Sequence, residues 1–254
     1  MVEQSFKERV RLKLMNCAVL YYELLVQKDY LIFSREFKYQ KYYIVSAFED
    51  NFLHLTGVHT NLQAKNFFEK CYQKTLEDGD FEINDKSQKG SVRRKMSVLE
   101  NAIQIFSSEA IVVEENFNKN RISCSFASSD KVCTIGFTKT KLAKPQTILK
   151  GYQLHDEVKV DLILSRNKGE TDFQTVVYNT LDMTLEECME LIKTKWYGCD
   201  ETVEWFLLSL FYGIRRKKMR IHDFNNRIEE IKKDVLESPQ EYIKLLEVIG
   251  NNHW

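Results

Sequence analysis

The feature that most constrains the fold is a hydrophobic periodicity that changes twice along the chain. Before Ala110, apolar residues recur mostly at three- and four-residue spacing, which is typical of amphipathic helices. Between Ala110 and Tyr178 they form short β-branched runs separated by turn residues, and helical spacing returns from Thr184. Because the predicted strands cluster instead of alternating with helices, the pattern predicts an α+β fold and excludes a doubly wound sheet.

The N-terminal part is predicted to contain helices and one hairpin. The helices are expected over residues 4–28 and 61–76 and from Ser91 onward. The hairpin is expected to pair a strand at Tyr39–Phe48 with a second strand at Asn51–Val58, where apolar and polar residues alternate. In the second strand, His54 and Thr56 share one face.

The middle of the chain is predicted to form a twisted antiparallel meander. Its strands are β-branched, end at turns rich in Asn, Ser, Asp and Gly, and are expected at 110–117, 121–126, 132–138, 146–149, 158–164 and 171–178. The last part is predicted to be helical over 184–196, 199–214, 222–236 and 239–249. The chain should therefore divide into an N-terminal helix over 1–37, an α+β domain over 38–180 and a helical C-terminal region over 181–254.

Charge is balanced over the whole chain, with 37 Lys and Arg against 37 Asp and Glu, but it is not evenly distributed. Between Lys119 and Lys168 there are ten basic residues and four acidic ones, so the predicted sheet carries a positive excess. A second basic cluster occupies residues 215–220. Positive surfaces attract a phosphate backbone. A solvated face is the competing explanation for both clusters, and it is favoured for residues 215–220, where basic residues at a helix C-terminus would also complement the helix dipole.

Sequence motifs for several common chemistries are absent. There is no P-loop, dinucleotide-binding, zinc-protease or α/β-hydrolase motif, and no set of His, Cys and carboxylates at metal-ligand spacing. We therefore expect neither a metal nor a cofactor. Six scattered cysteines without a CxxC pair predict reduced thiols. The lack of a signal peptide or a long apolar run predicts a cytoplasmic protein that does not associate with a membrane.

One stretch of the sequence resembles a known family. It consists of Lys41-Tyr42-Tyr43-Ile44-Val45 and Asn51-Phe52-Leu53-His54-Leu55-Thr56-Gly57-Val58. These residues resemble the phage-associated branch of the barnase–EndoU–colicin–RelE-like nucleases, whose members carry an N-F-x-H-L-[TL]-G-type strand followed by a helix and a sheet. The predicted order of elements over residues 38–180 is similar, so the resemblance implies a sheet of this superfamily's type.

The resemblance implies a metal-independent endoribonuclease, with a toxin or a phage-defence effector as its expected biological role. Acid–base transesterification needs a base for the ribose 2′-hydroxyl, an acid for the leaving 5′-oxygen and cations around the phosphorane. His54 is the first candidate for proton transfer because an unperturbed imidazole titrates near neutral pH. A buried histidine bonded to the backbone is the competing interpretation.

Other residues are candidates for phosphate and RNA contacts. Thr56 is expected either to hydrogen-bond His54 or a phosphate oxygen, or simply to pack in its strand. The cations expected to stabilise the phosphorane are Lys139, Lys150 and Arg166, at least two of which should reach one phosphate in a cleft floored by the sheet. The residues expected to bind RNA through charge, hydrogen bonding or stacking are Lys141, Lys144, Thr147 and Tyr152.

Two further functional classes remain open. A non-catalytic module that binds nucleic acid or protein would keep the fold and the basic sheet without a complete site. An ADP-ribosyltransferase is disfavoured because the adjacent residues Glu114 and Glu115 project to opposite faces of a strand. The apolar run at 205–212 is too wide for one helix stripe. It predicts that this helix is either the centre of the helical C-terminal region or the contact with a partner, which could be a cognate inhibitor, another protein or a second copy in a homodimer.

Overall fold

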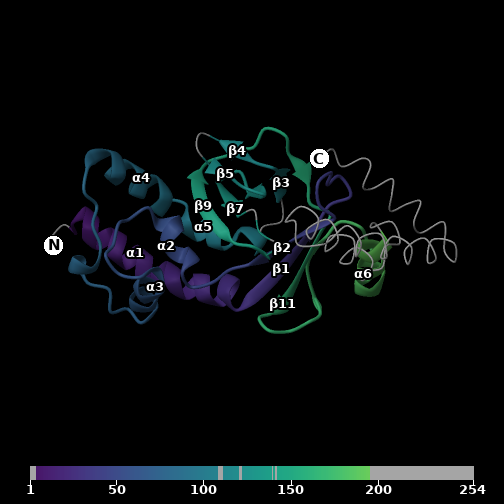
Figure 1. Ribbon diagram of the computed structural model, residues 1–254, viewed down its shortest axis with the longest axis horizontal. Coiled ribbons are helices and arrows are strands. Elements are labelled where there is room, and N and C mark those ends of the chain that lie inside the picture. The colour runs from purple at the N-terminus through teal and green to yellow at the C-terminus, as the bar shows by residue number, and fades with distance from the viewer. Residues whose placement is uncertain (1–3, 108–110, 120–121, 139, 141, 195–254) are drawn as a thin grey trace, which may run out of the picture. The chain divides into compact units, whose positions relative to one another are not determined.

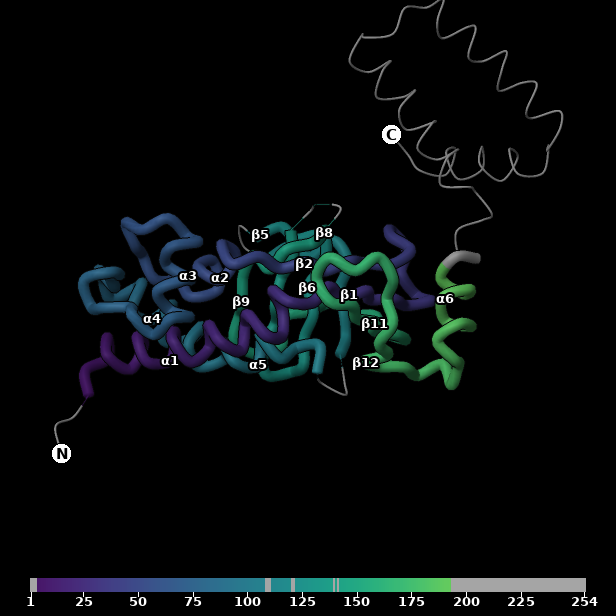
Figure 2. Tube along the Cα trace, turned by 90° about the horizontal axis from the view of Figure 1, so that it is seen from below, coloured from purple at the N-terminus to yellow at the C-terminus, as the bar shows by residue number. Residues whose placement is uncertain are grey.

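The computed structural model describes residues 4–107, 111–119, 122–138, 140 and 142–194. Its helical elements, besides short 3-10 turns, are α1 (Phe6–Tyr21) with a π-helical continuation (Tyr22–Val26), α2 (Asn51–Thr56), α3 (Ala64–Tyr72), α4 (Lys86–Met96), α5 (Leu99–Ile103) and α6 (Leu185–Thr194). Helices α1 to α4 gather beside the strands in both views of the molecule (Figures 1 and 2). The N-terminal helices and the antiparallel sheets confirm the predicted α+β class.

The strands form two five-stranded sheets. The first has the order β12-β11-β1-β2-β8, with bounds Thr175–Asn179, Leu162–Asn167, Lys28–Phe33, Tyr42–Ser46 and Leu142–Ala143. The second has the order β10-β3-β6-β7-β9, with bounds Val158–Lys159, Val112–Glu115, Phe126–Ser129, Cys133–Phe137 and Pro145–Lys150. A small ribbon pairs β4 (Asn118–Lys119) with β5 (Ile122–Ser123). The pairs in both large sheets are antiparallel except for β2 and β8, which run parallel.

The strands of the predicted meander are thus divided between two sheets. The first sheet also contains β1, a strand from the N-terminal region that the sequence did not predict. Strand β1 occupies residues that the sequence placed at the end of the first helix and in the connection after it. It pairs with β2 on one side and with β11 on the other, so Leu31 lies opposite both Ile44 and Leu164. The domain boundary expected after residue 37 consequently falls between two hydrogen-bonded strands of one sheet.

The segment Asn51–Val58 is not the strand that the alternation predicted. Residues 51–56 form α2, and its buried residues include Phe52, Leu55 and Thr56, which lie three and four positions apart on one helix face. The helix ends at Gly57, whose φ of 77° places it in the left-handed region that favours glycine at this position. The hairpin with a turn at Asp50-Asn51 is therefore wrong as well.

The bounds of helices α4 and α6 can also be compared with those predicted from the sequence. Helix α4 begins at Lys86 rather than Ser91, because Asp85 caps it by accepting a hydrogen bond from the Gln88 N–H at 2.7 Å. Helix α6 lies within the first helix expected in the C-terminal region. The other predicted C-terminal helices and the basic cluster at 215–220 lie outside the described residues.

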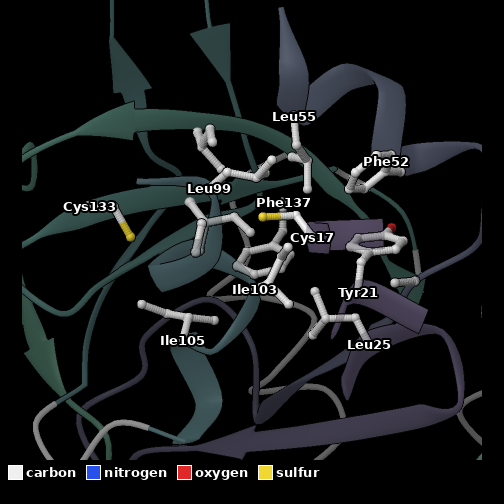
Figure 3. Close-up of a cluster of buried hydrophobic side chains, with 14 of the residues drawn as sticks. Cys17, Tyr21, Leu25, Phe52, Leu55, Leu99, Ile103, Ile105, Cys133 and Phe137 are labelled. Carbon is white, nitrogen blue, oxygen red and sulfur yellow. The ribbon is translucent and has the colours of Figure 1, made fainter. Parts of the chain in front are cut away.

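The core lies between the helices and the two sheets. Figure 3 shows Tyr21 next to Phe52 of α2, with Cys17, Leu25 and Leu55 in the same cluster. The ring of Tyr21 lies 5.1 Å from that of Phe52, measured between centroids. Buried residues of α1, including Cys17 and Tyr21, belong to the same apolar cluster as residues of both sheets. The first helix is therefore part of the main core and not an appendage.

Two adjacent carboxylates on β3 hold connecting segments on opposite sides of the strand. Glu115 accepts hydrogen bonds from the backbone N–H groups of residues 38–40 and from the Tyr43 hydroxyl, the last at 2.8 Å. Glu114 accepts from the backbone N–H groups of residues 155–156, at 2.6 and 3.3 Å. Each carboxylate is thus committed to a connection, and the two point apart as neighbouring residues of a strand must.

Candidate functional site

The histidine that the sequence singles out is exposed on α2. Helix α2 packs against β9, which carries two of the predicted contact residues, Thr147 and Lys150. Thr56 has a different role from the one expected. It is fully buried, its hydroxyl donates to the Leu53 carbonyl at 2.8 Å, and it accepts from the Val58 N–H at 3.3 Å. Thr56 therefore stabilises the end of α2 instead of facing a phosphate.

Phe48 lies immediately before α2 and is held there by its backbone. Its N–H donates to the Asn51 side chain at 3.0 Å, and its carbonyl accepts from the Tyr21 hydroxyl at 2.9 Å. Its ring contacts two cations, the amine of Lys168 at 4.2 Å and that of Lys144 at 4.7 Å from the ring centroid. Residues 49–50 form a turn and α2 begins at Asn51, so His54 lies in the first helical turn after Phe48.

Asp29 organises the cations next to Phe48. It is 5% exposed on β1, and Ser46 of β2 and Arg166 of β11 are its partners in the sheet register. One oxygen of Asp29 accepts from the Lys168 amine at 3.2 Å, and the other accepts from Arg166 Nε at 3.1 Å. The Lys168 amine also donates to the Ser46 hydroxyl and to the Ala47 carbonyl. We call Asp29, Phe48, Lys144, Arg166 and Lys168 the Phe48 cluster.

Arg166 is less available to a ligand than the sequence suggested. Besides its bonds to Asp29, its Nη1 donates to the Thr171 carbonyl at 2.5 Å, and its guanidinium lies 4.6 Å from the centroid of the Phe173 ring. The side chain is 19% exposed. Nearby, Glu170 accepts from the Asn167 side chain and backbone, and these bonds lower the pKa of its carboxyl. Arg166 therefore contributes charge to the cluster from a fixed position.

The other predicted cations and contact residues do not all meet at one point. Lys144 directly precedes β9, whereas Lys150 ends it, and six residues of extended strand separate them by roughly 20 Å. Lys150 and Tyr152 are exposed near that far end, and Thr147 is half-buried between the two ends. Lys139 and Lys141 lie outside the described residues. Of the predicted set, the described structure thus joins Lys144 and Arg166, through Lys168 and Phe48.

Lys95 of α4 is a further cation beneath α2. Its amine donates to the His54 carbonyl at 2.8 Å, and burial lowers the pKa of this amine from its usual value to about 8. The contact satisfies one of the carbonyls that a helix leaves unpaired at its C-terminal end. In the sequence Lys95 follows Arg93 and Arg94 directly, and nothing in that run distinguishes it from them.

Sequence reasoning missed Asp29, Phe48 and Lys95, and it counted Lys168 without selecting it. Asp29 lies on a strand that the periodicity did not reveal, and its partner Arg166 is 137 residues away. The one available signal was the placement of Lys168 in a turn, between Asn167 and Gly169, inside the basic segment.

Within the described ranges, no group of three or more His, Cys, Asp or Glu side chains is arranged to hold a metal ion. The helices in this part of the chain also lack the length and apolar character needed to cross a bilayer. The free cysteines seen there are buried, and burial raises the pKa of the Cys17 thiol to about 11.

Comparison with known protein families identifies a match over most of the chain. The model of the family described as phage-Barnase-EndoU-ColicinE5/D-RelE like nuclease4 matches residues 13–186. The matched region begins within α1, includes both sheets and ends at the start of α6. No curated protein and no solved structure matches the chain.

Proposed function

The chain belongs to the family of phage-Barnase-EndoU-ColicinE5/D-RelE like nucleases, and from this membership we propose that it cleaves RNA by acid–base transesterification beside the Phe48 cluster. A nuclease must place cations around a phosphate and a proton-transfer group within reach of it. The observation that carries the proposal is the convergence of Lys144 and Lys168 on Phe48, at the start of the helix that bears His54.

In this mechanism His54 transfers a proton to or from the reacting oxygens. The amines of Lys144 and Lys168 bind the scissile phosphate, and Arg166, held by Asp29, adds positive potential from the next strand. The nucleophile is the ribose 2′-hydroxyl, which restricts the reaction to RNA. Further along the strand, Thr147, Lys150 and Tyr152 contact flanking nucleotides, and Lys139 and Lys141 add charge to this contact.

The decisive experiment compares His54→Ala with His59→Ala, a second exposed histidine five residues away. The substrate is an end-labelled RNA, tested with and without EDTA. We expect His54→Ala to lower the rate by roughly 10²–10⁴-fold, because a positioned proton-transfer group contributes about that much. The products should end in 2′,3′-cyclic phosphate, and cleavage should persist in EDTA because no metal takes part.

Three results would contradict the proposal. They are full activity in His54→Ala, an equal loss in His59→Ala, and cleavage at a position that carries a 2′-deoxyribose. A toxin or phage-defence role adds a cellular expectation. Expression of the wild-type chain should arrest growth, and expression of His54→Ala should not.

A non-catalytic RNA-binding module is the second candidate. The observation that favours it is that no described side chain hydrogen-bonds the His54 imidazole, whereas catalytic histidines are usually oriented by a partner. This function would be supported if the protein binds RNA without cleaving it and if substitution of Lys168 weakens that binding.

A further inference from the structure

A basic hollow lies outside the Phe48 cluster, where the N-terminal end of α1 meets α4. It is lined by Phe6, Lys7, Glu82, Ile83, Asn84 and Lys89. Phe6 and Lys7 are the first two residues of α1, and Lys89 belongs to the first half of α4. None of these residues takes part in the reaction proposed above.

Aromatic rings hold three cations at this hollow. The amine of Lys89 lies 5.3 Å and the guanidinium carbon of Arg93 5.5 Å from the centroid of the Phe6 ring. The amine of Lys7 lies 5.1 Å from the centroid of the Phe81 ring. Cation–π contacts fix the cations without neutralising them. The arrangement therefore concentrates positive charge at one place.

These cations lack the carboxylate partners that two other cations of α1 have. Arg11 pairs with Asp78 and Lys13 with Glu100, whereas Lys7, Lys89 and Arg93 form no ion pair with any described residue. Lys89 and Arg93 are four residues apart on one helix face, where like charges repel. Glu82, among the lining residues, balances one charge of the three. An anionic ligand that enters the hollow would remove the remaining repulsion.

The hollow and the Phe48 cluster lie at opposite ends of α1. The 16 residues of α1 span roughly 24 Å, and the chain then passes through the π-helical turn to Asp29 on β1. Figure 2 shows α1 leading from the helical end of the molecule to the strands. Tyr21, the last residue of α1, donates its hydroxyl to the Phe48 carbonyl, so the length of α1 approximates the separation of the two sites. At about 3.4 Å per nucleotide along a helical strand, roughly 24 Å corresponds to roughly seven nucleotides.

We propose that the basic hollow binds a backbone phosphate of the same RNA, about seven nucleotides from the phosphate held at the Phe48 cluster. This inference rests on the proposed function for the identity of the ligand. Two linked contacts raise the affinity for a strand long enough to reach both, and leave shorter strands unaffected. The hollow thus gives the protein a preference for RNA above a minimum length.

The test measures the binding of non-cleavable 2′-O-methyl RNA of about 20 and about 5 nucleotides, lengths chosen above and below the span between the sites. The variant is Lys89→Ala/Arg93→Ala. The control, Lys65→Ala/Arg94→Ala, removes the same charge from exposed positions of α3 and α4. Loss of two phosphate contacts should weaken binding of the long RNA by about tenfold or more and reduce its salt dependence. The short RNA should bind as before, and the control should change by less than about twofold.

A second variant separates charge from folding. Lys89→Met/Arg93→Met keeps long apolar stems on the Phe6 ring, so it should match the alanine variant in RNA affinity and the wild type in its unfolding midpoint. The proposal fails if both RNA lengths lose affinity equally, if the control loses as much, or if the long RNA is unaffected. It also fails if a polyglutamate peptide binds the hollow as tightly as RNA, which would assign the surface to an acidic protein.

Because binding is measured without cleavage, failure of the catalytic proposal has a different signature. An inactive protein that still shows the length-dependent loss would refute the ribonuclease and support the hollow. An active ribonuclease without that loss would refute the hollow and leave the catalytic proposal standing.

Discussion

Asp29 determines what the cations around it are able to do. Its carboxylate, 5% exposed, bonds both Lys168 and Arg166 and keeps them on the face of the sheet next to Phe48. Without this carboxylate, the positive charges of Lys168 and Arg166 would face each other next to the Phe48 ring. Removing one partner of a buried ion pair costs more free energy than the intact pair contributes, because the other charge is left buried and uncompensated.

We therefore expect Asp29→Ala to lower the free energy of unfolding by about 2–4 kcal/mol, since Lys168 and Arg166 lose their shared acceptor. Urea denaturation measures this. The control is Glu49→Ala, whose exposed pair with Lys65 at 3.4 Å should contribute less than about 1 kcal/mol. Equal effects of the two substitutions would show that Asp29 does not organise the cluster.

Lys95 gives a prediction about pH. Burial lowers the pKa of its amine to about 8 in the folded state, whereas an unfolded lysine has a pKa near 10.5. Between these values the unfolded chain binds more protons, so this residue makes the free energy of unfolding rise as pH increases from about 8 to about 10.5. Lys95→Met should lack that rise.

The measurement for Lys95 is the difference between wild type and Lys95→Met in urea denaturation at several pH values. Thiols and phenols whose pKa burial raises, such as those of Cys17 and Tyr30, titrate in both proteins and cancel in the difference. Parallel curves for the two proteins would contradict the prediction.

At the scale of residues, composition pointed to the segment that contributes Lys144, Arg166 and Lys168 to the Phe48 cluster, but not to their partners. The excess of Lys and Arg after residue 118 identified Lys144 and Arg166. It could not show that Arg166 is bonded to Asp29, because that contact depends on a strand pairing across 137 residues. Side-chain type predicts charge, whereas availability to a ligand depends on tertiary contacts.

At the scale of elements, α2 shows why a short pattern is ambiguous. Six residues contain too few turns to separate a period of 2 from a period of 3.6, and the run from Phe52 to Leu55 satisfies both. Two features at the ends of the segment favour the helix. The Asn51 side chain accepts a hydrogen bond from the Phe48 N–H at its start, and Gly57 adopts the left-handed conformation that ends it. The strand expected at 146–149, by contrast, lies within β9.

The end of α2 allows a direct test with glycines. Gly57 has a positive φ, and a Cβ there would lie 3.0 Å from Cδ of Lys95. Gly57→Ala should therefore destabilise the protein by about 1–2 kcal/mol. Gly90→Ala lies inside α4, where the added Cβ meets Arg94 at an ordinary 3.6 Å, and should stabilise it by about 0.5–1 kcal/mol. Thermal unfolding distinguishes the two signs, and the same sign for both would contradict this account.

At the scale of the whole molecule, the N-terminal region is built into both the core and a sheet. Buried residues of α1 share the main cluster with both sheets, and β1 is the central strand of the first sheet. The sequence could not show this, because a short apolar strand that follows a helix continues the helix pattern. The boundary expected at residue 37 implies that the chain after it folds without residues 1–37, and this can be tested.

We expect the fragment 38–254 not to fold cooperatively, because it lacks α1 and leaves β2 and β11 without the strand between them. Loss of a sigmoidal denaturation curve, with the far-ultraviolet circular dichroism signal as the probe, would show this. A fragment that unfolds cooperatively would instead support the boundary at 37.

The two carboxylates on β3 also make the pairing of that strand unambiguous. A slip of β3 by one residue would exchange its faces, so neither Glu114 nor Glu115 would meet the backbone groups it now accepts from. Residues 38–40 connect β1 to β2, which belong to the other sheet. The β1–β2 connection of the first sheet can therefore form its hydrogen bonds to Glu115 only once β3 is in register in the second sheet. The chain should accordingly gain its two sheets in a single concerted step, with no long-lived state in which one has formed and the other has not.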